Sequence, residues 1–206
     1  MFRRFLCGAA ALGVFAALAQ ADVVITEWMY SGASGEFIEF TNVGAAPVDL
    51  TDWSYDDDSA VPGSVDLSPL GIVDPGESVI LTEIDAATFI AEWGLAGVSV
   101  LGGNTNNLGR NDQINLFDDS GALADRLTYG DQTFAGSIRT QNTSGIPSSP
   151  AALGADDVYQ WQFAATGDAY GSYTSASGDV GNPGVYVPEP AAVILLLTGG
   201  LAIRRR

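Results

Sequence analysis

The sequence predicts an all-β protein, a two-sheet antiparallel sandwich with one short peripheral helix. Short apolar runs recur along the 206-residue chain, and Gly, Ser, Thr, Asn and Asp separate them. This spacing is typical of strands joined by tight turns. Roughly seven or eight such strands favour two stacked sheets around one core.

The N-terminal part of the body contains the clearest strands. Residues 23–30 are rich in β-branched and aromatic side chains. Residues 36–42 alternate, so Glu39 is expected to face away from Ile38. Pro75 and Gly76 form a turn, because Pro presets φ and Gly accepts positive φ. Shorter strands are expected at residues 48–50, 53–55, 78–82 and 98–101.

A single helix is predicted on the rim of the sheets. Asp85 has the side chain of an N-cap, and Gly94 is a typical helix stop. Between them, Phe89, Ile90 and Trp93 share one helical face.

A hairpin follows, with strands at residues 113–117 and 122–129. The turn between them is Asp118-Asp119-Ser120-Gly121, with Gly at its end. The inward side chains expected to cover the core are Ile114, Leu116, Leu127 and Tyr129.

The pattern weakens over residues 131–186, which are dense in Ser, Gly, Thr and Pro. Residues 158–163, with Trp161, are predicted as one more strand. Two interpretations of this extension stay open: an ordered segment packed on the sandwich, or a flexible stalk.

Residues 1–21 have the order of a secretory signal peptide. Two arginines precede an apolar run, and Ala19 and Ala21 form a small-residue cleavage site. Cleavage there starts the mature chain at Asp22 and removes Cys7, the only cysteine, so neither a disulfide nor thiol chemistry is expected.

Residues 187–206 also have the pattern of a targeting segment. An apolar stretch at residues 191–203 is short for a stable membrane span, which needs about 20 residues. Terminal arginines favour a cytoplasmic C-terminus. We expect transient inner-membrane anchoring, with a plain C-terminal anchor as the alternative. A Pro-Glu-Pro motif (Pro188, Glu189 and Pro190) precedes the apolar stretch, and Arg204, Arg205 and Arg206 follow it.

The body between these ends is strongly acidic. It has 24 of the 25 acidic residues but only three arginines, so its formal net charge is −21. Nucleic acid and anionic lipid surfaces are therefore excluded as partners, whereas cations and neutral polysaccharide are compatible. The alternative is that acidity only keeps the protein soluble.

Several catalytic classes are excluded by residue type. Histidine and lysine are absent, which removes Ser-His-Asp triads, the usual zinc sites and Schiff bases. Asp119-Ser120-Gly121 matches an aspartic-protease triplet but has no second copy. Glu27 and Glu39 are the remaining acid pair for glycoside hydrolysis, although a structural role is the stronger interpretation.

No cofactor is predicted, with calcium as the open exception. Asp56, Asp57 and Asp58 place three carboxylates on one loop after Asp52. They lack EF-hand spacing, and a solvated loop is the alternative.

Six aromatic residues invite a sugar-binding interpretation. We favour core positions for Trp53 and Trp93 and leave Trp161 open. The full set is Trp28, Tyr30, Trp53, Tyr55, Trp93 and Trp161.

Several of these segments, taken in order, resemble bacterial lamin tail domains. The resemblance covers residues 22–130 and implies an immunoglobulin-like β-sandwich that acts as an interaction module. A closing Gly-Asn-Pro-Gly segment at residues 181–184 resembles secreted members of that family. The matching segments are residues 24–27, 36–42, 47–53, 74–76 and 108–116.

The C-terminal motif resembles a PEP-CTERM sorting signal. That resemblance implies an exosortase-type processing enzyme as a partner and delivery to the surface or extracellular matrix of a Gram-negative bacterium. The expected function is therefore a non-catalytic surface module whose partners include exopolysaccharide or other surface proteins. The alternatives are a carboxylate-dependent carbohydrate-active enzyme and a calcium-dependent matrix adhesin.

Overall fold

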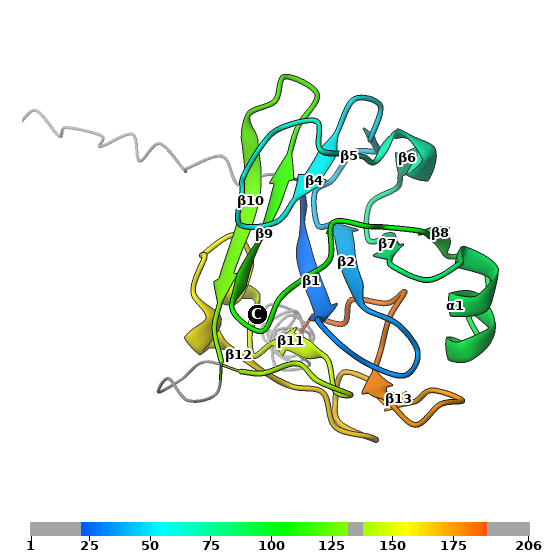
Figure 1. Ribbon diagram of the computed structural model, residues 1–206. Helices are drawn as coiled ribbons and strands as arrows, with labels where there is room; N and C mark the ends of the chain where they lie inside the picture. Colours follow the sequence, from blue (N-terminus) through cyan, green and yellow to red (C-terminus); the bar gives the residue numbers. More distant parts are fainter. Residues whose placement is uncertain (1–21, 132–137, 189–206) are drawn as a thin grey trace, which may run out of the picture.

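A computed structural model describes residues 22–131 and 138–188 and confirms the expectation of β-sheets with one α-helix (Figure 1). Three short 3-10 turns, η1 (Ser68–Leu70), η2 (Pro150–Ala152) and η3 (Val158–Gln160), accompany the helix α1 (Ala86–Trp93). The strands are β1 (Val23–Met29), β2 (Phe37–Asn42), β3 (Val48–Asp49), β4 (Ser54–Asp56), β5 (Val65–Asp66), β6 (Ile72–Val73), β7 (Ser78–Thr82), β8 (Ser99–Leu101), β9 (Asp112–Phe117), β10 (Leu123–Tyr129), β11 (Gly145–Pro147), β12 (Trp161–Phe163), β13 (Tyr173–Thr174) and β14 (Val180–Gly181).

Two sheets form the body of the molecule. The larger has the strand order β12-β11-β1-β2-β7-β8, and the smaller has the order β10-β9-β4-β5. Neighbouring strands are antiparallel except β7 and β8, which run parallel. The pairs β3-β6 and β13-β14 are two separate ribbons.

The main core lies between the inner faces of the two sheets. The four side chains expected inward from the β9-β10 hairpin are all buried there, which confirms that prediction. Trp28 contacts the ring of Tyr129 at a centroid distance of 5.4 Å and that of Trp161 at 4.9 Å. Gly145 pairs with Trp28 across the strands. A Cβ at position 145 would lie only 2.5 Å from the indole, so this close approach requires glycine.

The helix α1 packs on the outer face of the larger sheet. Its N-terminus is capped by Asp85, which accepts a hydrogen bond from the Thr88 amide, and Gly94 ends it in the left-handed conformation. Both predicted caps are confirmed. Phe89 and Trp93 are buried against the sheet in a second, smaller apolar cluster.

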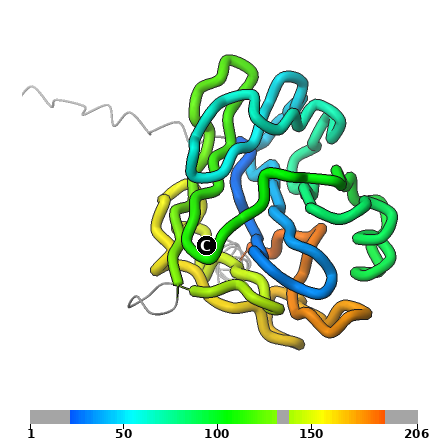
Figure 2. Tube along the Cα trace, in the orientation of Figure 1, coloured from blue at the N-terminus to red at the C-terminus, as the bar shows by residue number. Residues whose placement is uncertain are grey.

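The extension contributes two strands to the larger sheet. β11 lies beside β1, and β12 lies beside β11, so the first strand of the body has a neighbour from residues 145–147 (Figure 2). The strand predicted at residues 158–163 is shorter than expected. Its first half is the η3 turn, because the Asp157 carboxylate accepts a hydrogen bond from the Tyr159 amide and fixes a turn there.

The predicted end segments lie largely outside the described residues. These include Ala19 and Ala21 of the cleavage site, Glu189 and Pro190 of the sorting motif, and the terminal Arg204, Arg205 and Arg206. Within residues 22–131 and 138–188, no helix has the length and apolarity of a membrane span.

Candidate functional site

The outer face of the larger sheet has an apolar half and a polar half. The apolar half consists of Met29, Phe37 and Ile80, which α1 covers. The polar half is equally buried, although it lies away from the helix contacts. Its side chains are Thr26, Glu27, Glu39, Thr41 and Ser78, which we call the glutamate cluster.

A β-bulge places two of these side chains together. The register of β1 against β2 shifts between Ile25 and Glu27, so Thr26 and Glu27 both turn toward the face that carries Glu39. Glu27 is the direct cross-strand partner of Glu39. Both residues are only 1% exposed.

A closing segment, residues 180–188, covers the two carboxyl groups. The Asn182 amide donates to Glu27 Oε1 at 2.9 Å, and the Gly184 amide donates to Glu39 Oε2 at 2.6 Å. The Ser144 hydroxyl also donates to Glu27 Oε1. Each glutamate therefore holds a backbone amide from a segment about 150 residues away in sequence: 155 residues for Glu27 and 145 for Glu39.

Hydroxyl groups complete the cluster. Thr26 Oγ1 donates to Glu39 Oε1 at 2.5 Å, and Thr41 Oγ1 donates to the same oxygen at 3.2 Å. Thr41 and Ser78 share a further hydrogen bond of 2.7 Å. Glu39 thus accepts three hydrogen bonds in a site without solvent access, which fixes its position tightly.

Burial favours the neutral form of both acids. Desolvation raises the pKa of Glu27 well above its ordinary value, and the neighbouring charge of Glu39 raises it further. Burial also raises the pKa of Glu39, although its hydrogen bonds oppose the shift. Within the described part of the chain, Glu27 Oε2 has no hydrogen-bond partner. The arrangement is suited to holding a segment in place, since no substrate can reach the carboxyl groups.

The three loop aspartates do not act alike. Asp56 is buried and accepts hydrogen bonds from the Ser59 hydroxyl at 2.6 Å and the Val61 amide at 2.5 Å. Asp57 accepts one from the Ser59 amide, and the Asp58 amide donates to Asp112. Across the residues that the structure describes, no group of three or more Asp, Glu, His or Cys side chains is arranged to hold a metal ion. Calcium binding by Asp56, Asp57 and Asp58 stays an untested alternative to a solvated loop.

The protease-like triplet lies in the predicted hairpin turn. The Asp118 carboxylate accepts hydrogen bonds from the Ser120 and Ala122 amides, and Gly121 has a φ of 77°. These contacts are those of a tight turn.

Most of the six aromatic residues belong to the core. Trp93 is buried as expected, and Trp53 packs partly buried against the main cluster. Trp161, left open by the sequence, is 6% exposed and contacts Trp28.

The sequence pattern pointed to Glu27 and Glu39 but not to their partners. Ser144 has no distinguishing pattern. Asn182 and Gly184 belong to the Gly-Asn-Pro-Gly segment, which was the one available signal. Gly181 is required there because a Cβ would lie 2.7 Å from Glu27 Oε1.

Comparisons with known proteins give one positive result. The family model described as Lamin Tail Domain matches residues 16–131, which is more than half of the chain. No curated protein and no solved structure matches.

Proposed function

The chain belongs to the lamin tail domain family, and from that premise we propose that it is a non-catalytic interaction or structural module that works outside the cell. The family has an immunoglobulin-like sandwich and is generally non-catalytic. The expected all-β class with one peripheral helix agrees with that fold.

The observation that carries this proposal is the burial of Glu27 and Glu39, the acid pair that the sequence offers for glycoside hydrolysis. Glu27 and Glu39 are 1% exposed and hold amides of the closing segment. Glycosidase carboxyls must flank a bound glycosidic bond, with room for a sugar between them. The absence of histidine and lysine from the sequence supports the same conclusion.

Activity assays on polysaccharides test the non-catalytic assignment. We expect no release of reducing ends by the wild-type chain. Turnover by the wild type that both Glu27→Gln and Glu39→Gln abolish would overturn it. Glu77→Gln is the matched control, since Glu77 lies in a surface turn and its carboxylate accepts a hydrogen bond from the Asp74 amide.

Export and sorting form the second part of the proposal. The signal peptide pattern at residues 1–21 and the Pro-Glu-Pro motif before an apolar stretch and three arginines support it. An exosortase-type enzyme then removes the tail and releases the module to the surface or matrix.

Intact-mass measurement on protein from the native host tests sorting. We expect a mature chain that starts at Asp22 and lacks the terminal arginines. A Glu189→Ala variant is expected to retain the tail, since it loses the central residue of the motif. Wild-type protein that still ends at Arg206 would exclude the sorting step.

A further inference from the structure

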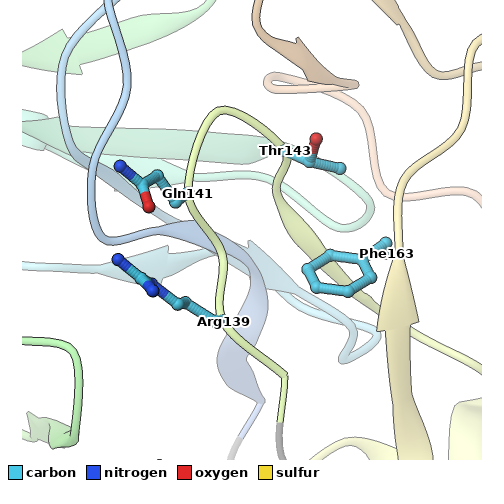
Figure 3. A pocket seen from close by; sticks show the side chains of 4 residues that line it. All are labelled: Arg139, Gln141, Thr143 and Phe163. Atoms are coloured by element: carbon cyan, nitrogen blue, oxygen red, sulfur yellow. The ribbon is translucent and has the colours of Figure 1, made fainter. Parts of the chain in front are cut away.

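A cavity of about 400 Å³ opens on the extension. It is lined by Arg139, Gln141, Thr143 and Phe163 (Figure 3). The first three alternate along one stretch of chain, whereas Phe163 comes from the edge strand β12. The volume lies within the range of small-molecule sites, which is roughly 300–1,000 Å³.

The guanidinium group in this cavity is held by one end only. Arg139 Nε donates to the Tyr30 hydroxyl at 3.1 Å, which orients the side chain. Among the described residues, its two terminal nitrogens have no hydrogen-bond partner. Arg110, by contrast, forms an ion pair with Asp131. An oriented donor fork in a cavity is therefore available to a ligand.

The four lining side chains offer the kinds of contact that a sugar ring makes. The guanidinium fork can donate to two adjacent hydroxyl oxygens, and the Gln141 amide can both donate and accept. Thr143 adds a hydroxyl group. The Phe163 ring, whose residue is 36% exposed, offers an apolar face to the C–H groups of a sugar ring.

We propose that this cavity binds one ring of a neutral polysaccharide. The inference rests on the proposed function, because it names the partner class of a non-catalytic extracellular module. The formal charge of −21 on the body repels a polyanion at long range, whereas a neutral polymer pays no such penalty. A uronate polymer shares the hydroxyl chemistry and would pair its carboxylate with Arg139, so the experiment includes it as a separate arm.

Isothermal titration of the full chain with neutral and uronate-bearing oligosaccharides distinguishes these ligands. We expect neutral oligosaccharides to bind, and Arg139→Gln to weaken binding roughly ten- to a hundredfold, as expected for lost hydrogen bonds to a charged group. Arg139→Lys keeps the charge but loses the fork, so it should weaken binding of neutral sugars nearly as much. Phe163→Leu should cost about three- to tenfold.

The control variant is Arg110→Gln, which removes an exposed arginine outside the cavity and should leave binding unchanged. Unaltered thermal midpoints establish that the variants fold. Three results would each overturn the inference: binding by no oligosaccharide, binding restricted to uronates, or equal binding by Arg139→Gln and the wild type. Release of reducing ends, measured on the same samples, would instead refute the non-catalytic function and leave the sugar site standing.

Discussion

Two sets of carboxyl groups in this protein face opposite physical conditions. Glu27 and Glu39 lie beneath the closing segment, where burial raises their pKa values. Asp118 lies in a surface turn, where the hydrogen bond from the Ser120 hydroxyl is the main cause that lowers its pKa. The buried glutamates therefore hold a distant segment by hydrogen bonds, and burial favours their neutral form. Asp118 instead stabilises a turn as an anion.

The comparison changes how the acidity of the chain should be interpreted. The formal charge of −21 counts every acid in the body as ionised. Burial raises the pKa of Glu36 to about 8 and that of Asp125 to about 6, in addition to the two clustered glutamates. The effective negative charge at neutral pH is thus smaller than the formal charge.

The largest expected effect comes from deleting a clustered glutamate. Glu39→Ala leaves the Thr26 hydroxyl and the Gly184 amide without their acceptor in a buried site, so we expect a loss of about 3 kcal/mol in the free energy of unfolding. Asp118→Ala, in the exposed turn, should lose about 1 kcal/mol or less. Urea unfolding measures both values, and equal losses would contradict the distinction between the two sets.

An intermediate effect is expected from pH. The folded state binds protons more tightly than the unfolded chain wherever a carboxyl pKa is raised, so stability falls as pH rises through that window. For Glu36 the window runs from its ordinary value of 4.5 to about 8. Its contribution to the slope is at most about 1.4 kcal/mol per pH unit. The lowered pKa of Asp118 acts in reverse, so stability is lost as pH falls below its ordinary value of 3.8.

Urea unfolding between pH 5 and pH 8, compared for the wild type and Glu36→Gln, measures this slope. The variant should show a flatter dependence across this range, most clearly in its middle, since it removes the titrating group. Wild-type stability that rises from pH 5 to pH 8 would contradict the assigned direction of the pKa shift.

The smallest effect is expected from calcium. The Asp56 carboxylate is already occupied by Ser59 and Val61, which leaves few oxygens for a cation. Adding millimolar calcium after EDTA should move the thermal midpoint by less than about 1 °C. A rise of several degrees that Asp57→Asn and Asp58→Asn remove would instead establish a calcium site on this loop.

Local sequence signals predicted the local structure well. Asp85 and Gly94 gave both ends of the helix, and the Asp118 turn gave the hairpin, because each signal acts through neighbouring backbone groups. The alternation in β2 placed Glu39 correctly on the face opposite Ile38. It did not reveal that this second face is buried, because the covering segment lies 145 residues further along the chain.

The local sequence did not predict the cavity on the extension either. Arg139, Gln141 and Thr143 do alternate in the sequence, but nothing nearby indicates that Phe163 completes their site. Only the pairing of β11 with β12 brings that ring to the same cavity. Long-range pairing, rather than composition, thus decides which polar residues of the extension meet.

The position of β11 also fixes the order in which the chain can become native. In any synthesis or translocation that starts at the N-terminus, β1 emerges before its neighbour β11, which follows about 117 residues later, as the Glu27–Ser144 contact records. Until then one edge of the sheet stays open. Folding to completion is therefore a late event, because non-local pairing must await its partner. A chain that moves through a narrow channel from its N-terminus would consequently stay incompletely folded, and able to pass, until β11 has emerged.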